Sequence, residues 1–123
     1  MIQLRSVLAS ADNSGARRLK VIHVHGGSWR RFGYIGDMVS VVVDGADPNG
    51  TVKDSQLVKA VIVRTRKETR REDGTYVRFD DNAAVIIDEK TKDPIASRVF
   101  GPIAREVKDR GYTKIASLAE EVV

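Results

Sequence analysis

The sequence predicts a mainly β fold, a small closed barrel of short strands with one or two short helices at its C-terminal end. Gly, Asn, Asp and Pro turn signals alternate with β-branched runs through roughly the first hundred residues, a pattern typical of antiparallel strands with short connections. Five or more such strands favour closure, because an open sheet would leave its edges free to aggregate. Beyond Phe100 the spacing of apolar residues becomes helical.

The expected strands are runs rich in β-branched residues. In residues 38–43, Val39, Val41 and Val43 point to one face and the alternate residues to the other, and both faces are apolar enough for a barrel wall. The strands are expected at residues 2–8, 17–25, 37–43, 57–65, 75–79 and 83–87, with a further candidate at 95–99.

Short turn sequences separate these strands: DNSG at 12–15, DPNG at 47–50, DG at 73–74 and DP at 93–94. Their residues accept a positive φ or preset a turn. The DG pair is followed by TYVRF, which predicts a β-hairpin with a type I′ turn.

The C-terminal part is expected to be a short helical segment over about 102–119 that packs on the barrel. Pro102 suits the first position of a helix, and Gly111 suits the position that ends one. The apolar stripe of this segment is Ile103, Val107, Ile115 and Leu118. With 123 residues and no internal repeat or linker, the chain is expected to form a single domain over 1–123.

The charge of the chain is segregated. The net charge is +4, and no acidic residue lies between Asp12 and Asp37. The same stretch contains Arg17, Arg18, Lys20, Arg30 and Arg31, and a second basic cluster, RTRKETRR, lies at 64–71. A basic face would attract a polyanion. The alternative is an ordinary surface rich in Lys and Arg, but a dispersed surface would not leave so long a stretch without an acid.

The chain lacks the residues that several classes of function require. The chain has no cysteine, which excludes disulfides, thiolate metal sites and thiol catalysis and suits a reducing cytosol. No run approaches the roughly 20 apolar residues of a membrane span, and the N-terminus has no signal-peptide pattern. We therefore expect a soluble protein without a membrane partner that stays in the compartment where it is made.

The stretch HGGSWRRFGYIGD at 25–37 could hold phosphate, but it does not match a nucleotide site. A P-loop needs a glycine followed by Lys and then Ser or Thr, and none is present. A dinucleotide fingerprint or a KH-type clamp needs a helix after its glycines, whereas these run into the β-rich DMVSVVV. We expect no cofactor and no small-molecule substrate.

Metal and nucleophile sites are also disfavoured. His23 and His25 lie on one face of an expected strand, but any third zinc ligand would have to be a carboxylate, and none lies nearby in the sequence. Ser28 is close to both histidines but lacks the strand-to-helix turn that presents a serine nucleophile. We expect no metal and no catalytic residue.

Nucleic-acid binding explains more of the pattern. Gly26 and Gly27 remove bulk beside Arg30 and Arg31, whose forked side chains match phosphate oxygens. Trp29 could stack on an unpaired base or plug the end of the barrel, and exposure is the favoured expectation. Phe32 and Tyr34 are expected to pack.

In the second cluster, alternation places Arg64 and Arg66 on one strand face, and Lys67, Arg70 and Arg71 point outward on the hairpin. The full set of expected RNA-binding residues is Arg17, Arg18, Lys20, Ser28, Trp29, Arg30, Arg31, Arg64, Arg66, Lys67, Arg70 and Arg71. The alternatives are a barrel that binds an acidic protein and, less favoured, an enzyme.

Several motifs of the chain resemble those of a known family. They are ADNSGARR at 11–18, GGSWRR at 26–31, GD at 36–37, KAVIVRT at 59–65, DGTYVRFDDNAAVII at 73–87, RVFGPIAREV at 98–107 and KIASLAEEV at 114–122. In order and spacing, over essentially the whole chain, they are similar to the bacterial form of large-subunit ribosomal protein fourteen.

This resemblance implies a five-stranded barrel with a projecting hairpin and a structural role in the large ribosomal subunit, in the cytoplasm. It implies binding to large-subunit rRNA, contact with small-subunit rRNA in intersubunit bridges, and neighbouring large-subunit proteins, number nineteen and possibly number three. It also implies that a ribosome silencing factor docks at Ser97, Arg98 and Lys114. Trp29 replaces a small or polar residue of the family, Ser97 a common threonine, and Glu120 a proline, while Gly33-Tyr34 alters a typical Tyr-Ala-Gly.

Overall fold

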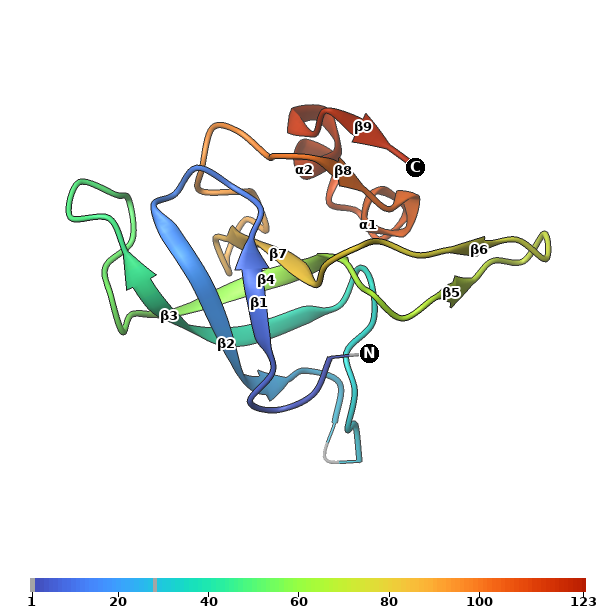
Figure 1. The fold of residues 1–123 in the computed structure, drawn as a ribbon, viewed down its shortest axis with the longest axis horizontal. Coiled ribbons are helices and arrows are strands. Elements are labelled where there is room, and N and C mark those ends of the chain that lie inside the picture. Colours follow the sequence, from blue (N-terminus) through green and yellow to red (C-terminus); the bar gives the residue numbers. More distant parts are fainter. Residues whose placement is uncertain (1, 28) are drawn as a thin grey trace.

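Five strands close into a barrel in the computed structural model, which describes residues 2–27 and 29–123 (Figure 1). Neighbouring strands are antiparallel except where β1 closes the barrel against β7 in parallel. In the order around the barrel the strands are β1 (Val7–Ser10), β2 (Ala16–Val24), β3 (Met38–Ala46), β4 (Leu57–Arg64) and β7 (Ala83–Ile87). The prediction of a small closed β-barrel is therefore confirmed.

The core has two parts, one on each side of the β4–β7 wall. Inside the barrel, Leu19, Val41 and Ile62 belong to one apolar cluster. On the outer side, Val61 and Val85 pack with the C-terminal segment in a second cluster. Because both faces of this wall are covered, all of β7 and most of β4 is buried. In β3, by contrast, only the alternate valines are fully buried, as the sequence predicted.

The C-terminal segment contains two short helices framed by a small parallel sheet. Strand β8 (Pro102–Ile103) pairs with β9 (Glu121–Val122), and between them lie α1 (Arg105–Asp109) and α2 (Thr113–Leu118). The expectation that Pro102 opens a helix is wrong, because residues 102–103 pair with the chain end and α1 begins only after Ala104. Gly111 follows α1 with φ +98, as predicted. Neither helix of the described chain is long and apolar enough to cross a membrane.

The predicted strands at residues 2–8 and 95–99 differ most from the structure, and the one at 75–79 is reduced to Tyr76–Val77. Strand β1 begins at Val7 and not at residue 2, because Arg5 has a φ of 70° and the Ser6 hydroxyl accepts a hydrogen bond from the Gln3 amide, forming a turn. Residues 95–99 form no strand, although bridges involve Pro94 and Val99 at its ends.

The predicted hairpin projects from the barrel as β5 (Thr69–Arg70) and β6 (Tyr76–Val77) (Figure 1). Its turn is not the expected type I′, because Gly74 has a positive φ of 86° and Asp73 does not. The Asp73 carboxylate accepts hydrogen bonds from the amide and hydroxyl of Thr75, and these local bonds hold the turn in its observed form.

Candidate nucleic-acid interface

The loop between β2 and β3 carries two predicted RNA-binding side chains that are open to solvent. Trp29 is 91% exposed, which confirms the expectation that it lies at the surface. Arg31 is also exposed and forms no hydrogen bond or ion pair with any described residue. Ser28, the third expected contact here, lies outside the described residues. Trp29 and Arg31 are therefore available to a ligand.

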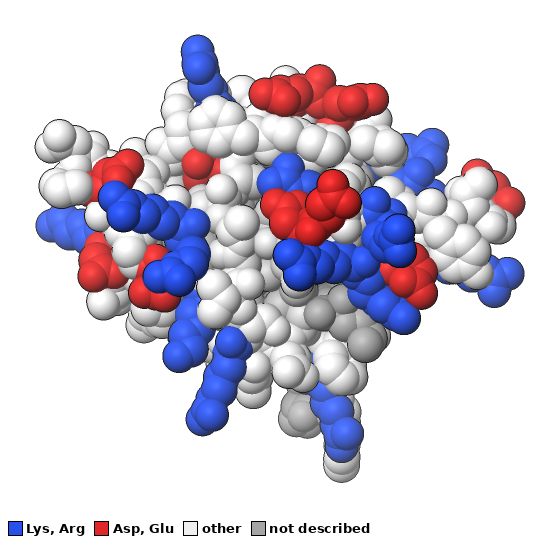
Figure 2. Space-filling model, in the orientation of Figure 1, with Lys and Arg blue, Asp and Glu red and all other residues white. Residues whose placement is uncertain are grey.

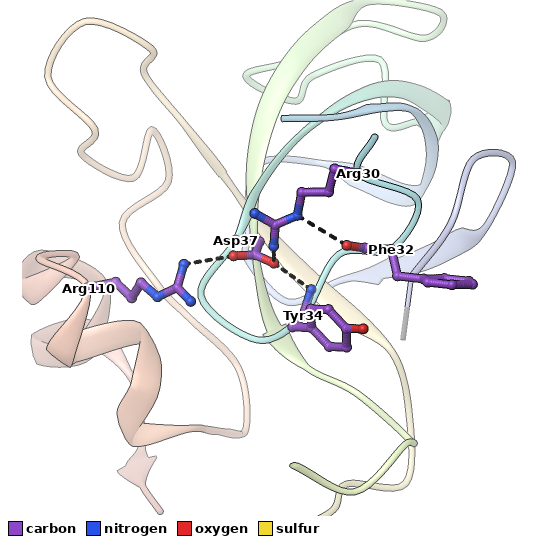
Figure 3. A network of polar contacts seen from close by, with 5 residues as sticks. All are labelled: Arg30, Phe32, Tyr34, Asp37 and Arg110. Atoms are coloured by element: carbon purple, nitrogen blue, oxygen red, sulfur yellow. Dashed lines mark hydrogen bonds and ion pairs between the residues drawn. The ribbon is translucent and has the colours of Figure 1, made fainter. Parts of the chain in front are cut away.

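Arg30 points the other way, into a network around the buried carboxylate of Asp37 (Figure 3). Its Nη2 donates to Asp37 Oδ2, and its Nε donates to the carbonyl oxygen of Phe32 at 3.3 Å. The same Asp37 Oδ2 accepts the amide of Tyr34 at 2.7 Å. Asp37 Oδ1 accepts Nη1 of Arg110, the residue that ends α1, at 2.8 Å. The network joins the loop, the start of β3 and α1.

The aromatic residues that follow Arg31 differ from each other. Phe32 is half-buried, whereas Tyr34 is 46% exposed, so the expectation that Tyr34 packs is wrong. The Tyr34 amide itself turns inward and donates to the Asp37 carboxylate.

The loop arginines also line a surface hollow of about 480 Å³. Its other walls come from the N-terminal turn, the end of β2 and the loop backbone: Gln3, Leu4, His23, Val24 and Gly27. The hollow combines apolar, imidazole and guanidinium groups, which suits a base with its phosphate.

Strand β2 adds further exposed cations, toward the end of the strand that lies away from this loop. Arg17 lies 3.3 Å from Asp47, and Arg18 lies 3.7 Å from Asp44, its cross-strand partner. Lys20 is exposed as well. Because ion pairs between exposed groups contribute little free energy, these arginines can exchange their carboxylates for phosphates at small cost.

The charge is only partly segregated in space. Figure 2 shows one face on which Lys and Arg side chains project from the lower edge and gather toward the base of the hairpin, while acidic side chains gather over the C-terminal segment at the top. Where β2 pairs with β3, bases and acids are interleaved.

The second basic cluster divides into residues that hold the fold and residues that remain outside. Arg64 is buried, and its Nη1 donates to the carbonyl oxygens of Phe100 and Pro102 at 2.8 and 3.1 Å. Its Nε lies 3.0 Å from Asp81 Oδ1. Arg66 is exposed, so the two do not share one strand face as expected. Strand β4 ends at Arg64 and Arg66 lies in a bend beyond it, so the alternation on which that expectation rested does not extend to Arg66.

Arg71 likewise makes contacts within the protein and holds the hairpin to the C-terminal segment. Its Nε donates to Glu106 Oε1 at 2.8 Å, and its Nη2 donates to the carbonyl oxygen of Val123 at 2.5 Å. Lys67 and Arg70 are exposed, and Lys67 lies 3.1 Å from Glu68. Arg71 is therefore not directed outward, in contrast to the expectation from the sequence.

The set of RNA-binding residues expected from the sequence does not include two exposed arginines near the hairpin, Arg78 and Arg105. Arg78 borders a hollow that also contains Asp80 and Asp81. Arg105 lines a hollow of about 440 Å³ between the hairpin and α1. Both residues lie outside the RTRKETRR run, so a search for dense basic runs passes over them.

A second exposed region is built by the ADNSG motif. Asn13 Oδ1 accepts the amides of Ser97 and Arg98, each at 3.1 Å, and its Nδ2 donates to the Ser97 hydroxyl at 3.0 Å. Asp93, four positions before Ser97, accepts a hydrogen bond from Nζ of Lys114 on α2 at 2.9 Å. The side chains of Ser97, Arg98 and Lys114 are exposed, and these contacts fix the segment that carries the first two.

The two histidines form part of a polar cluster across three strands. Their rings meet edge to face with centroids 4.8 Å apart, so they do share one face. His25 Nε2 lies 2.8 Å from the Ser40 hydroxyl and 3.3 Å from Lys59 Nζ. Burial, followed by the charges of Lys59 and His23, lowers the pKa of His25, while Glu89 opposes the shift. Among the described residues, no group of three or more His, Cys, Asp or Glu side chains could hold a metal ion.

Comparison with known proteins gives a match over the whole chain. The family model described as ribosomal protein L14p/L23e matches residues 1–123. The large ribosomal subunit protein uL14 of Petrotoga mobilis is 59% identical over 122 residues, which cover 99% of this chain and 99% of that protein.

Proposed function

Because the chain belongs to the L14p/L23e family of ribosomal proteins and is a structural constituent of the large subunit, we propose that it binds large-subunit rRNA through its β2–β3 loop and further exposed cations. The observation that carries the proposal is the exposed pair Trp29 and Arg31, which stands on a loop anchored by Asp37. A π face for a base and a forked cation for a phosphate are the groups that unpaired RNA requires.

The other expected RNA ligands are retained where their side chains are open to solvent. The cations proposed to meet phosphate are Arg17, Arg18, Lys20, Arg31, Arg66, Lys67 and Arg70. Arg64 and Arg71 are left out, because buried or half-buried contacts within the protein occupy their guanidinium groups. Ser28 keeps its place in the proposal on its position in GGSWRR alone.

We also infer contacts with partner proteins and with the small subunit at the second exposed region, which contains Ser97, Arg98 and Lys114. Ser97, Arg98 and Lys114 are exposed, and the backbone amides of the first two donate hydrogen bonds to Asn13 Oδ1, which holds them in place. Such a fixed polar surface supports docking of the ribosome silencing factor there. Contacts with small-subunit rRNA at intersubunit bridges and with large-subunit proteins nineteen and three complete the proposed set of partners, within the cytoplasmic ribosome.

Titration of a large-subunit rRNA fragment at several salt concentrations tests the RNA proposal. Each phosphate contact should contribute about 0.7 to 0.9 to the log–log slope of affinity against salt, so a grip by several cations gives a steep dependence. The Arg31→Ala variant should bind more weakly and with a slope lower by about one contact. A nearly flat dependence would instead favour a barrel that binds an acidic protein.

A further inference from the structure

We propose that Arg30, unlike its neighbour Arg31, is a positioning residue. Together with Asp37 and Arg110, it holds the β2–β3 loop in its RNA-binding shape. The inference rests on the proposed RNA-binding function. It assigns different roles to two adjacent arginines that are equivalent in the sequence.

The first support is the difference in their partners. Arg30 donates to both Asp37 Oδ2 and the Phe32 carbonyl oxygen, and its side chain is only 30% exposed. Arg31 is exposed and has no such partner among the described residues. A phosphate that approached Arg30 would compete with a carboxylate that is 3% exposed and already in contact.

The second support comes from the two loop glycines, because the atoms that a Cβ would meet at each position show which neighbour the glycine accommodates. Gly26 has a φ of +133°, and a Cβ at this position would lie 2.5 Å from Arg30 Cδ and 2.8 Å from Arg30 Nη1. Gly26 therefore leaves space for the folded-back Arg30 side chain. A Cβ on Gly27 would meet nothing within 4 Å, so only this second glycine borders open space where RNA could approach.

The third support is the close approach of α1 to the base of the loop. A Cβ on Gly36 would lie 3.1 Å from Arg110 Cγ and 3.3 Å from the Glu106 carbonyl oxygen. This spacing lets Arg110 reach Asp37 Oδ1 at 2.8 Å. Asp37 is also tied to the barrel, because its carbonyl oxygen accepts the amide of Ile62 in β4.

These contacts order the loop before any ligand arrives. A buried carboxylate is stable only while its partners remain, so loss of either arginine leaves the Asp37 charge with only one cationic partner and weakens the base of the loop. A loop ordered in advance loses less conformational entropy on binding than a loop that RNA must order. The network therefore acts on affinity without contributing a phosphate contact.

Lysine substitutions separate the two roles in the full-length chain. Lysine keeps the charge that phosphate needs but lacks the planar fork that reaches Asp37 and Phe32 together. Arg31→Lys should bind the rRNA fragment nearly as well as the parent. Arg30→Lys should bind about three- to tenfold more weakly with an unchanged salt slope, because order and not a phosphate contact is lost.

Arg110→Ala tests the α1 arm without altering the loop sequence. Its matched control is Lys108→Ala, an exposed cation of the same helix. Arg110→Ala should speed hydrogen exchange at the amides of residues 30–37 in the free protein and weaken RNA binding with an unchanged slope. Lys108→Ala should change neither. Because exchange is measured without RNA, it tests the positioning role even if Arg30→Lys fails to fold.

The outcomes distinguish this inference from the function on which it rests. If Arg30→Ala lowers the salt slope as much as Arg31→Ala, Arg30 is a phosphate ligand and the inference is wrong. Unchanged loop exchange in both Arg30→Lys and Arg110→Ala would also overturn it. If Arg31→Ala leaves both affinity and slope unchanged while loop exchange still responds to Arg110→Ala, the network positions the loop and the RNA-binding assignment of the loop fails instead.

Discussion

Asn13 and Ser97 are 84 positions apart in the chain and are joined by two hydrogen bonds, one from Asn13 Nδ2 to the Ser97 hydroxyl and one from the Ser97 amide to Asn13 Oδ1. A third bond links the Arg98 amide to the same oxygen. The turn after β1 thus determines where the segment before β8 lies. The Asn13 side chain accepts the backbone amides of residues 97 and 98, which have no strand partner because they form no strand.

We therefore expect Asn13→Ala to release residues 97–98. The bonds are exposed, so the free energy of unfolding should fall by only about 1 kcal/mol. Hydrogen exchange of the Ser97 and Arg98 amides should accelerate much more than exchange in β3. If the silencing factor docks at Ser97 and Arg98, its affinity should fall too. Unchanged exchange at both amides would show that Asn13 does not hold them.

Asp12, the neighbour of Asn13, should matter far more for stability. Its carboxylate is buried and accepts the hydroxyls of Ser10 and Ser14 at 2.8 and 2.6 Å and the amide of Ile86 at 3.0 Å. Asp12→Ala leaves the buried Ser14 hydroxyl and Ile86 amide without this partner, so we expect a loss of about 2 to 4 kcal/mol in urea unfolding. The exposed Asp44→Ala serves as a control and should change stability by less than about 0.5 kcal/mol. Equal effects of the two variants would contradict this assignment.

The barrel strands could be predicted from the sequence because the apolar pattern within each strand indicates which of its faces are buried. Alternation in β3 and the continuous apolar run of β7 each report the faces that the strand covers. The long-range polar contacts were not predictable in this way. Nothing near Asp37 indicates that Arg110, 73 positions away, is its partner, and a basic run gives no sign that Arg64 turns inward after a register shift.

Arg64 should therefore behave as a structural residue and not as an RNA ligand. Its guanidinium bridges the carbonyl oxygens of Phe100 and Pro102 and the Asp81 carboxylate. Arg64→Lys cannot make all three contacts, and we expect it to lower the free energy of unfolding by about 2 kcal/mol. Its RNA affinity, measured well below the melting temperature, should keep the parental salt slope. A slope reduced by one contact would instead return Arg64 to the RNA-binding surface.

His25 should make stability depend on pH in the range where histidine titrates. Burial, with Lys59 and His23 nearby, lowers its pKa below the ordinary value of 6.5, so the unfolded chain takes up a proton more readily than the folded protein. This contribution to stability is complete above about pH 7 and is lost as the pH falls below the ordinary histidine pKa and through the lowered pKa of His25. His25→Gln should flatten the profile in urea unfolding on the acidic side of neutral pH. An equally steep profile in His25→Gln would assign the pH dependence to other groups.

Trp29 should contribute to RNA binding and not to folding. A side chain that is 91% exposed cannot plug the barrel, so Trp29→Ala should leave the melting temperature within about a degree of the parent. If the indole stacks on a base, the variant should lose about 1 to 3 kcal/mol of RNA affinity, and RNA should quench the fluorescence of the parent, which has one tryptophan. Trp29→Phe keeps a π face and should recover most of the affinity. A Trp29→Ala variant that binds RNA like the parent would leave Arg31 as the loop's contact and rule out stacking by the ring.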